Sequence, residues 1–82
     1  MTVRRWERWV DAEVDWWSIE EGWGALVASG VPEGIFVHFS AIDGDVFPKD
    51  LRAGQRVAAL IEGPLDFEQD GYRYRAVEVR QS

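Results

Sequence analysis

The sequence predicts an all-β domain built as a closed or nearly closed antiparallel barrel. Glycine and proline divide the chain into several short β-rich runs, and their spacing is typical of small barrels. No convincing helical segment lies among these runs, and closing the sheet would remove the exposed edges that so small a sheet otherwise presents. The length of 82 residues allows one small domain and leaves too little chain for a second core.

The expected strands are separated by recognisable turn signals. The β-rich runs lie at residues 13–19, 23–28, 35–39, about 56–62 and 72–80. Residues 29–34 predict a turn, Asp43-Gly44-Asp45 opens a long loop, and residues 51–55 predict a tight turn before the fourth run. Asp70-Gly71 is a strong hairpin-turn signal ahead of the last run, because both residue types tolerate the positive φ angles that a two-residue turn needs.

The first eleven residues fit this pattern poorly, so we expect an amino-terminal arm over residues 1–11 and the barrel domain over residues 12–82. Val3, Trp6, Trp9 and Val10 recur at helical spacing, with charged residues between them. One interpretation is a short cap or strand extension whose tryptophans cover one end of the core. The other is a basic arm that reaches either a partner chain or a nucleic-acid backbone. In the first case the arm would join copies of this chain into a homo-oligomer.

Composition narrows the class of protein. The apolar fraction of 46% is ordinary for a globular chain and well above what disorder requires. The absence of cysteine excludes a disulfide framework and thiolate metal sites, and it is compatible with a reducing compartment. Because no apolar run follows the start and none approaches the roughly 20 residues of a membrane span, we expect a cytoplasmic protein with no membrane partner.

The charge balance argues against binding to nucleic acid through a general electrostatic field. Nine lysines and arginines stand against fifteen aspartates and glutamates, a formal net charge of −6. Nucleic-acid binders gain affinity by neutralising phosphates, and this chain as a whole repels them. Any such binding must therefore depend on local geometry and on stacking.

The residues that could carry catalysis are few. His38 is the one histidine, no nucleophile constellation accompanies it, and no ligands stand at metal spacing. Glu20-Glu21 and Asp43-Gly44-Asp45 are typical of solvated turns rather than of a carboxylate pair or a calcium site. We therefore expect no enzyme activity, no metal and no cofactor.

Aromatic side chains are plentiful. If residues 35–39 form a strand, alternation sends Ile35, Val37 and Phe39 to the core, and Phe36 and His38 to the opposite face. A barrel this small cannot bury all of its rings together with its aliphatic residues, so some rings must face solvent or a ligand. Exposed aromatics in a row on a sheet are the surface on which unpaired bases stack.

Several segments resemble the cold-shock domain family, over residues from about 12 to 79. Residues 35–39 (Ile-Phe-Val-His-Phe), followed by Ser-Ala-Ile, match the second ribonucleoprotein motif, and residues 22–27 match the first more weakly. Residues 14–18 resemble a family Val-Lys-Trp-Phe-Asn, residues 51–57 a family Leu-x-x-Gly-Gln-x-Val, and residues 76–79 a family Ala-x-Asn-Val.

The resemblance implies a five-stranded antiparallel OB-fold barrel that binds single-stranded RNA or DNA. In the family, bases stack on surface aromatics of the first three strands and of the loop beyond. The matching positions here are Trp16, Trp17, Trp23, Phe36, His38, Phe39 and Phe47.

Three departures from the family pattern affect this expectation. Asp15 and Glu21 replace two lysines beside the stacking surface, Ala25 replaces a central phenylalanine, and residues 63–71 form a longer, more acidic segment. We expect weaker binding than in typical members, with an affinity that falls little as salt is added. The alternative function is a repurposed barrel whose aromatic face mediates protein interaction or self-association.

Overall fold

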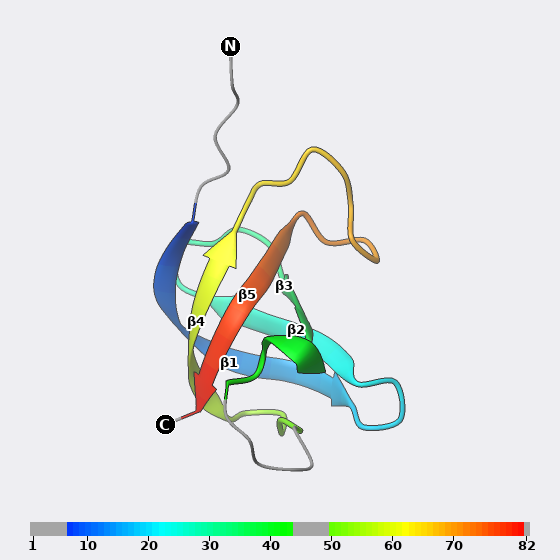
Figure 1. Ribbon diagram of the computed structural model, residues 1–82. Coiled ribbons are helices and arrows are strands. Elements are labelled where there is room, and N and C mark those ends of the chain that lie inside the picture. The colour runs from blue at the N-terminus through cyan, green and yellow to red at the C-terminus, as the bar shows by residue number, and fades with distance from the viewer. Residues whose placement is uncertain (1–6, 44–49, 82) are drawn as a thin grey trace.

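The computed structural model describes residues 7–43 and 50–81, and five β-strands account for most of them (Figure 1). The strands are β1 (Glu7–Ser18), β2 (Trp23–Ala28), β3 (Ile35–His38), β4 (Arg56–Glu62) and β5 (Tyr74–Gln81). One short 3₁₀ helix, η1 (Phe39–Ala41), follows β3. The predicted second and fourth strands have the observed bounds, whereas the last strand begins at Tyr74 rather than at residue 72.

The strands close into a barrel in the order β1-β2-β3-β5-β4, which confirms the five-stranded all-β barrel. The expectation of a purely antiparallel sheet is wrong, because β3 and β5 run parallel, with Ile35 opposite Tyr74 and Phe36 opposite Arg75. The reason is one of parity. Strand directions cannot alternate all the way around a closed ring of five, so one pair of neighbours must run the same way.

β1 is long enough to pair with two neighbours. Its first half pairs with β4, from Glu7 opposite Glu62 to Glu13 opposite Arg56, and its second half pairs with β2. Residues 7–11 are therefore part of the barrel, as a strand extension, but Trp9 is 44% exposed and does not cover the core as that interpretation expected. The apolar residues there recur at helical spacing, but no helix forms. Pairing with β4 provides hydrogen-bond partners for the backbone N–H and C=O groups that a helix would otherwise satisfy. Trp6 and the rest of residues 1–6 lie outside the described part of the chain.

The inner faces of the strands supply the core. The most completely buried large side chains are Val14, Leu26, Ile35, Val37, Ile61 and Val79. Phe39, expected in the core, is 42% exposed instead. The alternation that predicted its burial ends with β3 at His38, where the backbone turns into η1 and carries Phe39 outward.

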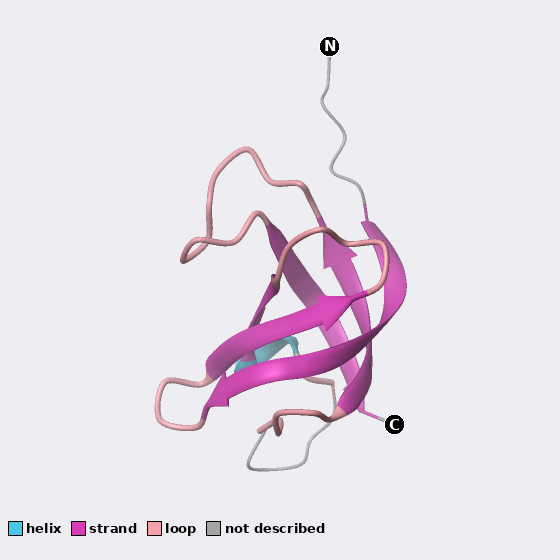
Figure 2. Ribbon diagram, turned by 180° about the vertical axis from the view of Figure 1, so that it is seen from behind, coloured by secondary structure: helices cyan, strands magenta, loops and turns pink. Residues whose placement is uncertain are grey.

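The hairpin turn expected at Asp70-Gly71 is confirmed. Both residues have positive φ angles, 51° and 88°, and Gln69 and Tyr72 exchange two backbone hydrogen bonds across them, of 2.7 and 2.9 Å. This small hairpin closes the tip of the long β4–β5 connection, which Figure 2 shows projecting beyond the ends of the strands. Among the described residues, no helix has the length and apolar character needed to span a membrane.

Candidate nucleic-acid interface

A β-bulge turns Trp16 to the outside of the barrel. Val14 pairs with Leu26 and Trp16 pairs with Ala25, so Asp15 is an extra residue in β1. In a regular strand Trp16 would follow Val14 to the inner face, two residues further along. The inserted residue shifts the alternation, as bulges do, and so places the indole of Trp16 on the outer face.

Three rings then pack in a row across the outer faces of β1, β2 and β3. The ring centroids of Trp16 and Trp23 lie 4.7 Å apart with their planes at 75°, and those of Trp23 and Phe36 lie 5.2 Å apart with a tilt of 31°. Both geometries are favourable for aromatic pairs. We call Trp16, Trp23 and Phe36 the aromatic row.

The rings of the row lie close against the sheet and against one another. Ala25 points to this outer face and is the cross-strand partner of both Trp16 and Phe36, yet it is only 1% exposed. Phe36 is 8% exposed and does not belong to the core cluster. The face predicted to be open is thus partly closed by its own side chains, while Trp16 and Trp23 remain partly accessible.

His38 and Phe39 continue the aromatic surface beyond the row. His38 is the cross-strand partner of Trp23, and its ring centroid lies 4.4 Å from that of Phe39. The imidazole Nδ1 accepts a hydrogen bond from the backbone N–H of Ser40 and lies 2.9 Å from the hydroxyl of the same serine. Phe39 lies over Gly22, where a Cβ would be 2.8 Å from the phenyl ring. Gly22 also has a φ angle of 73°, in the left-handed region, so this turn before β2 favours glycine.

Trp17 is not brought into this surface. It packs against the hydrophobic core from the inner side of β1, opposite Gly24, and its Nε1 donates a hydrogen bond of 3.3 Å to Oδ1 of Asp50. Its proposed contact with nucleic acid stays a prediction without support from its position. Phe47, also expected at the site, lies outside the described residues.

The groups around the row are acidic or already paired. Nε1 of Trp23 donates to Oε1 of Glu21 at 3.2 Å, so a carboxylate stands at the edge of this indole. Asp15 is exposed at the bulge. Arg75, the register partner of Phe36, donates from Nε to the buried carboxylate of Glu62. Phosphate groups near the row would meet these carboxylates, and Arg75, beside Phe36, is already engaged by Glu62.

Tyr72 reaches the aromatic row although no motif in the sequence pointed to it. Its hydroxyl accepts a hydrogen bond of 3.4 Å from Nε1 of Trp16, which connects the β4–β5 loop to the aromatic row. The signal in the sequence was the hairpin turn Asp70-Gly71, which fixes the residue after it. No periodicity shows where a residue in such a loop will point.

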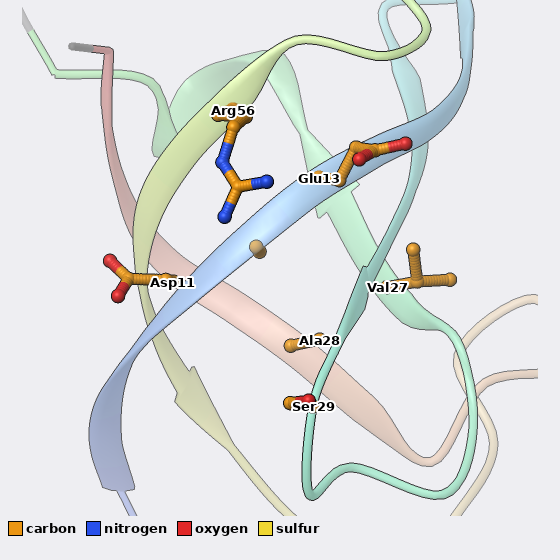
Figure 3. A pocket seen from close by; sticks show the side chains of 7 residues that line it. Asp11, Glu13, Val27, Ala28, Ser29 and Arg56 are labelled. Atoms are coloured by element: carbon orange, nitrogen blue, oxygen red, sulfur yellow. The ribbon is translucent and has the colours of Figure 1, made fainter.

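A shallow hollow elsewhere on the barrel does not share these features. Its lining residues come from β1, β2, the turn after β2 and β4: Asp11, Ala12, Glu13, Val27, Ala28, Ser29 and Arg56. Figure 3 shows the Arg56 side chain extending between Asp11 and Glu13. None of the residues that line this hollow has an aromatic ring on which a base could stack. The aromatic row therefore remains the candidate site.

No protein-family profile matches the sequence. The chain is 43% identical to the major cold shock protein CspA of Bacillus cereus over 53 residues. The matched residues make up 65% of this chain and 76% of that protein. It is 48% identical over 52 residues to the cold shock-like protein CspD of Bacillus cereus, covering 62% and 76%.

A third relative comes from another genus. The cold shock protein CapA of Pseudomonas fragi is 41% identical over 49 residues, which make up 60% of this chain and 75% of the relative. These identities agree with the five-stranded closed barrel and with the outward-facing rings on its first three strands. The chain belongs to the cold shock protein family.

Proposed function

We propose that this protein binds single-stranded RNA or DNA by stacking unpaired bases on the outer face of β1, β2 and β3. The observation that carries the proposal is the aromatic row itself, in which Trp16, Trp23 and Phe36 pack across three adjacent strands. Each base has a π-face, so a run of rings accepts successive bases with little regard to sequence.

The rings differ in what they offer a base. Trp16, Trp23 and His38 are partly exposed and Phe39 is exposed, so these four present free surface. Phe36 is nearly covered and instead supports the indole of Trp23 from the side. Phe36 therefore offers a base little free surface.

The acidic surroundings limit the electrostatic contribution. Glu21 and Asp15 lie beside the row, and the chain carries a net charge of −6. Affinity then comes from stacking and from polar contacts to the bases, with few phosphates neutralised. The expected behaviour is weak binding whose logarithm falls only slightly with the logarithm of the salt concentration.

The test is a titration of tryptophan fluorescence with pyrimidine-rich DNA and RNA oligonucleotides at two salt concentrations. Stacking on Trp16 or Trp23 should quench the emission, and Trp16→Ala should reduce affinity. Trp9→Ala is the matched control, because Trp9 lies on the first half of β1, against Arg80 of β5, with its ring centroid 4.6 Å from the guanidinium carbon. Absence of quenching at high micromolar oligonucleotide in low salt would refute the proposal.

Light scattering on the same samples addresses the competing protein-interaction function. A monomer that binds oligonucleotide supports the proposal. A dimer that forms through the aromatic face, and that binds no oligonucleotide, would favour self-association.

A further inference from the structure

The ring of Tyr72 occupies the place of a side chain at position 34. A Cβ built on Gly34 would lie 2.7 Å from Cε1 of Tyr72 and 3.3 Å from its Cδ1. Position 34 has the same parity as Phe36, whose side chain belongs to the outer face. The tyrosine ring therefore lies over the outer face of the sheet, immediately before β3.

The hydroxyl of Tyr72 reaches the other side of the same face. It accepts the hydrogen bond from the indole of Trp16, which is on β1, whereas Gly34 leads into β3. β2 lies between β1 and β3 in the barrel, so the Tyr72 side chain and the Trp16 indole together bridge the outer face of β2. Ala25 lies on that face between its partners Trp16 and Phe36, which accounts for its almost complete burial.

The position of Tyr72 is fixed by the loop that carries it. The hairpin at Asp70-Gly71 sets the backbone before it, and the N–H of Leu65 donates to the carbonyl of Arg73 directly after it, at 2.7 Å. Arg73 in turn forms a salt bridge of 2.7 Å with Glu33, next to Gly34. A ring held in this way needs little further ordering when a ligand binds.

We infer that Tyr72 is a base-contacting residue, which supplies from the β4–β5 loop an aromatic surface at the place where β2 carries only Ala25. The ring is partly exposed and adjoins the indole of Trp16, so a base can contact both. This inference rests on the proposed function and extends the site from the first three strands to the β4–β5 loop. The ligand class is an unpaired base of a single strand.

The experiment measures binding of a fluorescein-labelled oligodeoxythymidylate of about eight nucleotides by anisotropy, a length within the range bound by one OB fold. Tyr72→Ala should weaken binding by roughly 5- to 150-fold, the range for loss of one base–aromatic stack. Tyr72→Phe keeps the ring and should keep most of the affinity. Gly34→Ala keeps Tyr72 but displaces its ring, because the added methyl group would occupy the same space. This variant should therefore also bind more weakly.

Each outcome separates this inference from the proposed function. If the unmodified protein binds and the Tyr72→Ala variant binds equally well or more tightly, the inference is overturned. Tighter binding by the variant would mean that the tyrosine ring covers the site. If the unmodified protein does not bind at all, the proposed function itself fails. Should Tyr72→Ala not fold, the aromatic NMR signals of Tyr72 in the unmodified protein decide. They should move upfield with those of Trp23 during the titration, and unmoved Tyr72 signals would contradict the inference.

Discussion

The rings of Trp23 and Phe36 pack against each other across β2 and β3, with centroids 5.2 Å apart and planes tilted by 31°. Phe36 is only 8% exposed, whereas Trp23 remains partly accessible. The two residues therefore have unequal roles, one presenting a surface and the other supporting it.

Phe36→Ala should weaken oligonucleotide binding by about 1–3 kcal/mol, even though Phe36 is almost covered. The reason is that Trp23 loses its support and samples orientations in which its ring does not face a base. Near-ultraviolet circular dichroism should show the loss of fixed indole packing in this variant. If affinity falls while the tryptophan signal is unchanged, Phe36 contacts the base directly.

Glu21→Gln should strengthen binding, most clearly at low salt. Glutamine can still accept the hydrogen bond from Nε1 of Trp23, so the substitution removes a charge while leaving an acceptor at the ring edge. Two unit charges about 4 Å apart in water interact by about 1 kcal/mol. The gain in affinity should therefore be at most about fivefold. Affinity measured by anisotropy at two salt concentrations checks this, with the exposed Glu7→Gln as a control of equal charge change at the other end of β1.

Much of the fold follows from the sequence because its signals are local. The β-rich runs at residues 23–28 and 56–62, bounded by glycine and proline, and the Asp70-Gly71 turn each act over a few residues and predict the elements that the structure contains. The alternation from Ile35 predicted the burial of Val37 correctly and that of Phe39 wrongly. Whether Phe39 is buried depends on where β3 ends, and tertiary packing sets that position.

The candidate site shows the same division between local and long-range signals. Phe36 and His38 follow from strand parity within β3, and the structure pairs His38 with Trp23, which the family resemblance indicated. Trp16 reaches the outer face only through the bulge at Asp15, which alternation does not reveal and which sends Trp17 inward. Tyr72 comes to the row across 56 residues of sequence, so its place depends on the closed barrel.

Gly24→Ala should destabilise the protein strongly. A Cβ at this position would lie 2.2 Å from the carbonyl oxygen of Trp16 and 2.9 Å from Cα of Trp17. Both are backbone atoms, which cannot move away without disturbing the bulge between β1 and β2. Overpacking of this kind typically costs about 1–3 kcal/mol, and contact with rigid backbone belongs at or above the upper end. Chemical denaturation measures the loss, and unchanged stability would show that the strands separate easily at the bulge.

Ala25→Phe should be destabilising alone and better tolerated together with Tyr72→Ala. The added ring would compete with Tyr72 for the space above β2, since Ala25 is already covered. Removing the tyrosine ring makes that space available, so the double variant should be more stable than the sum of the single effects predicts. A double-mutant cycle by thermal or chemical unfolding gives the coupling, and strictly additive effects would mean that the two side chains do not share this space.

The salt bridge between Arg73 and Glu33 should weaken as the solution is acidified. The hydrogen bond from the Arg73 guanidinium lowers the pKa of Glu33 below its usual value of 4.5. A carboxyl whose pKa is lowered by folding contributes stability above its unfolded pKa, and this contribution is lost as the pH falls through the folded value. Both side chains are substantially exposed, so the effect on global stability is small and is concentrated in the β4–β5 loop.

In an NMR titration, Arg73→Gln should raise the pKa of Glu33 toward 4.5 and loosen the loop at neutral pH. An unchanged pKa in this variant would show that the ion pair does not hold the loop in solution.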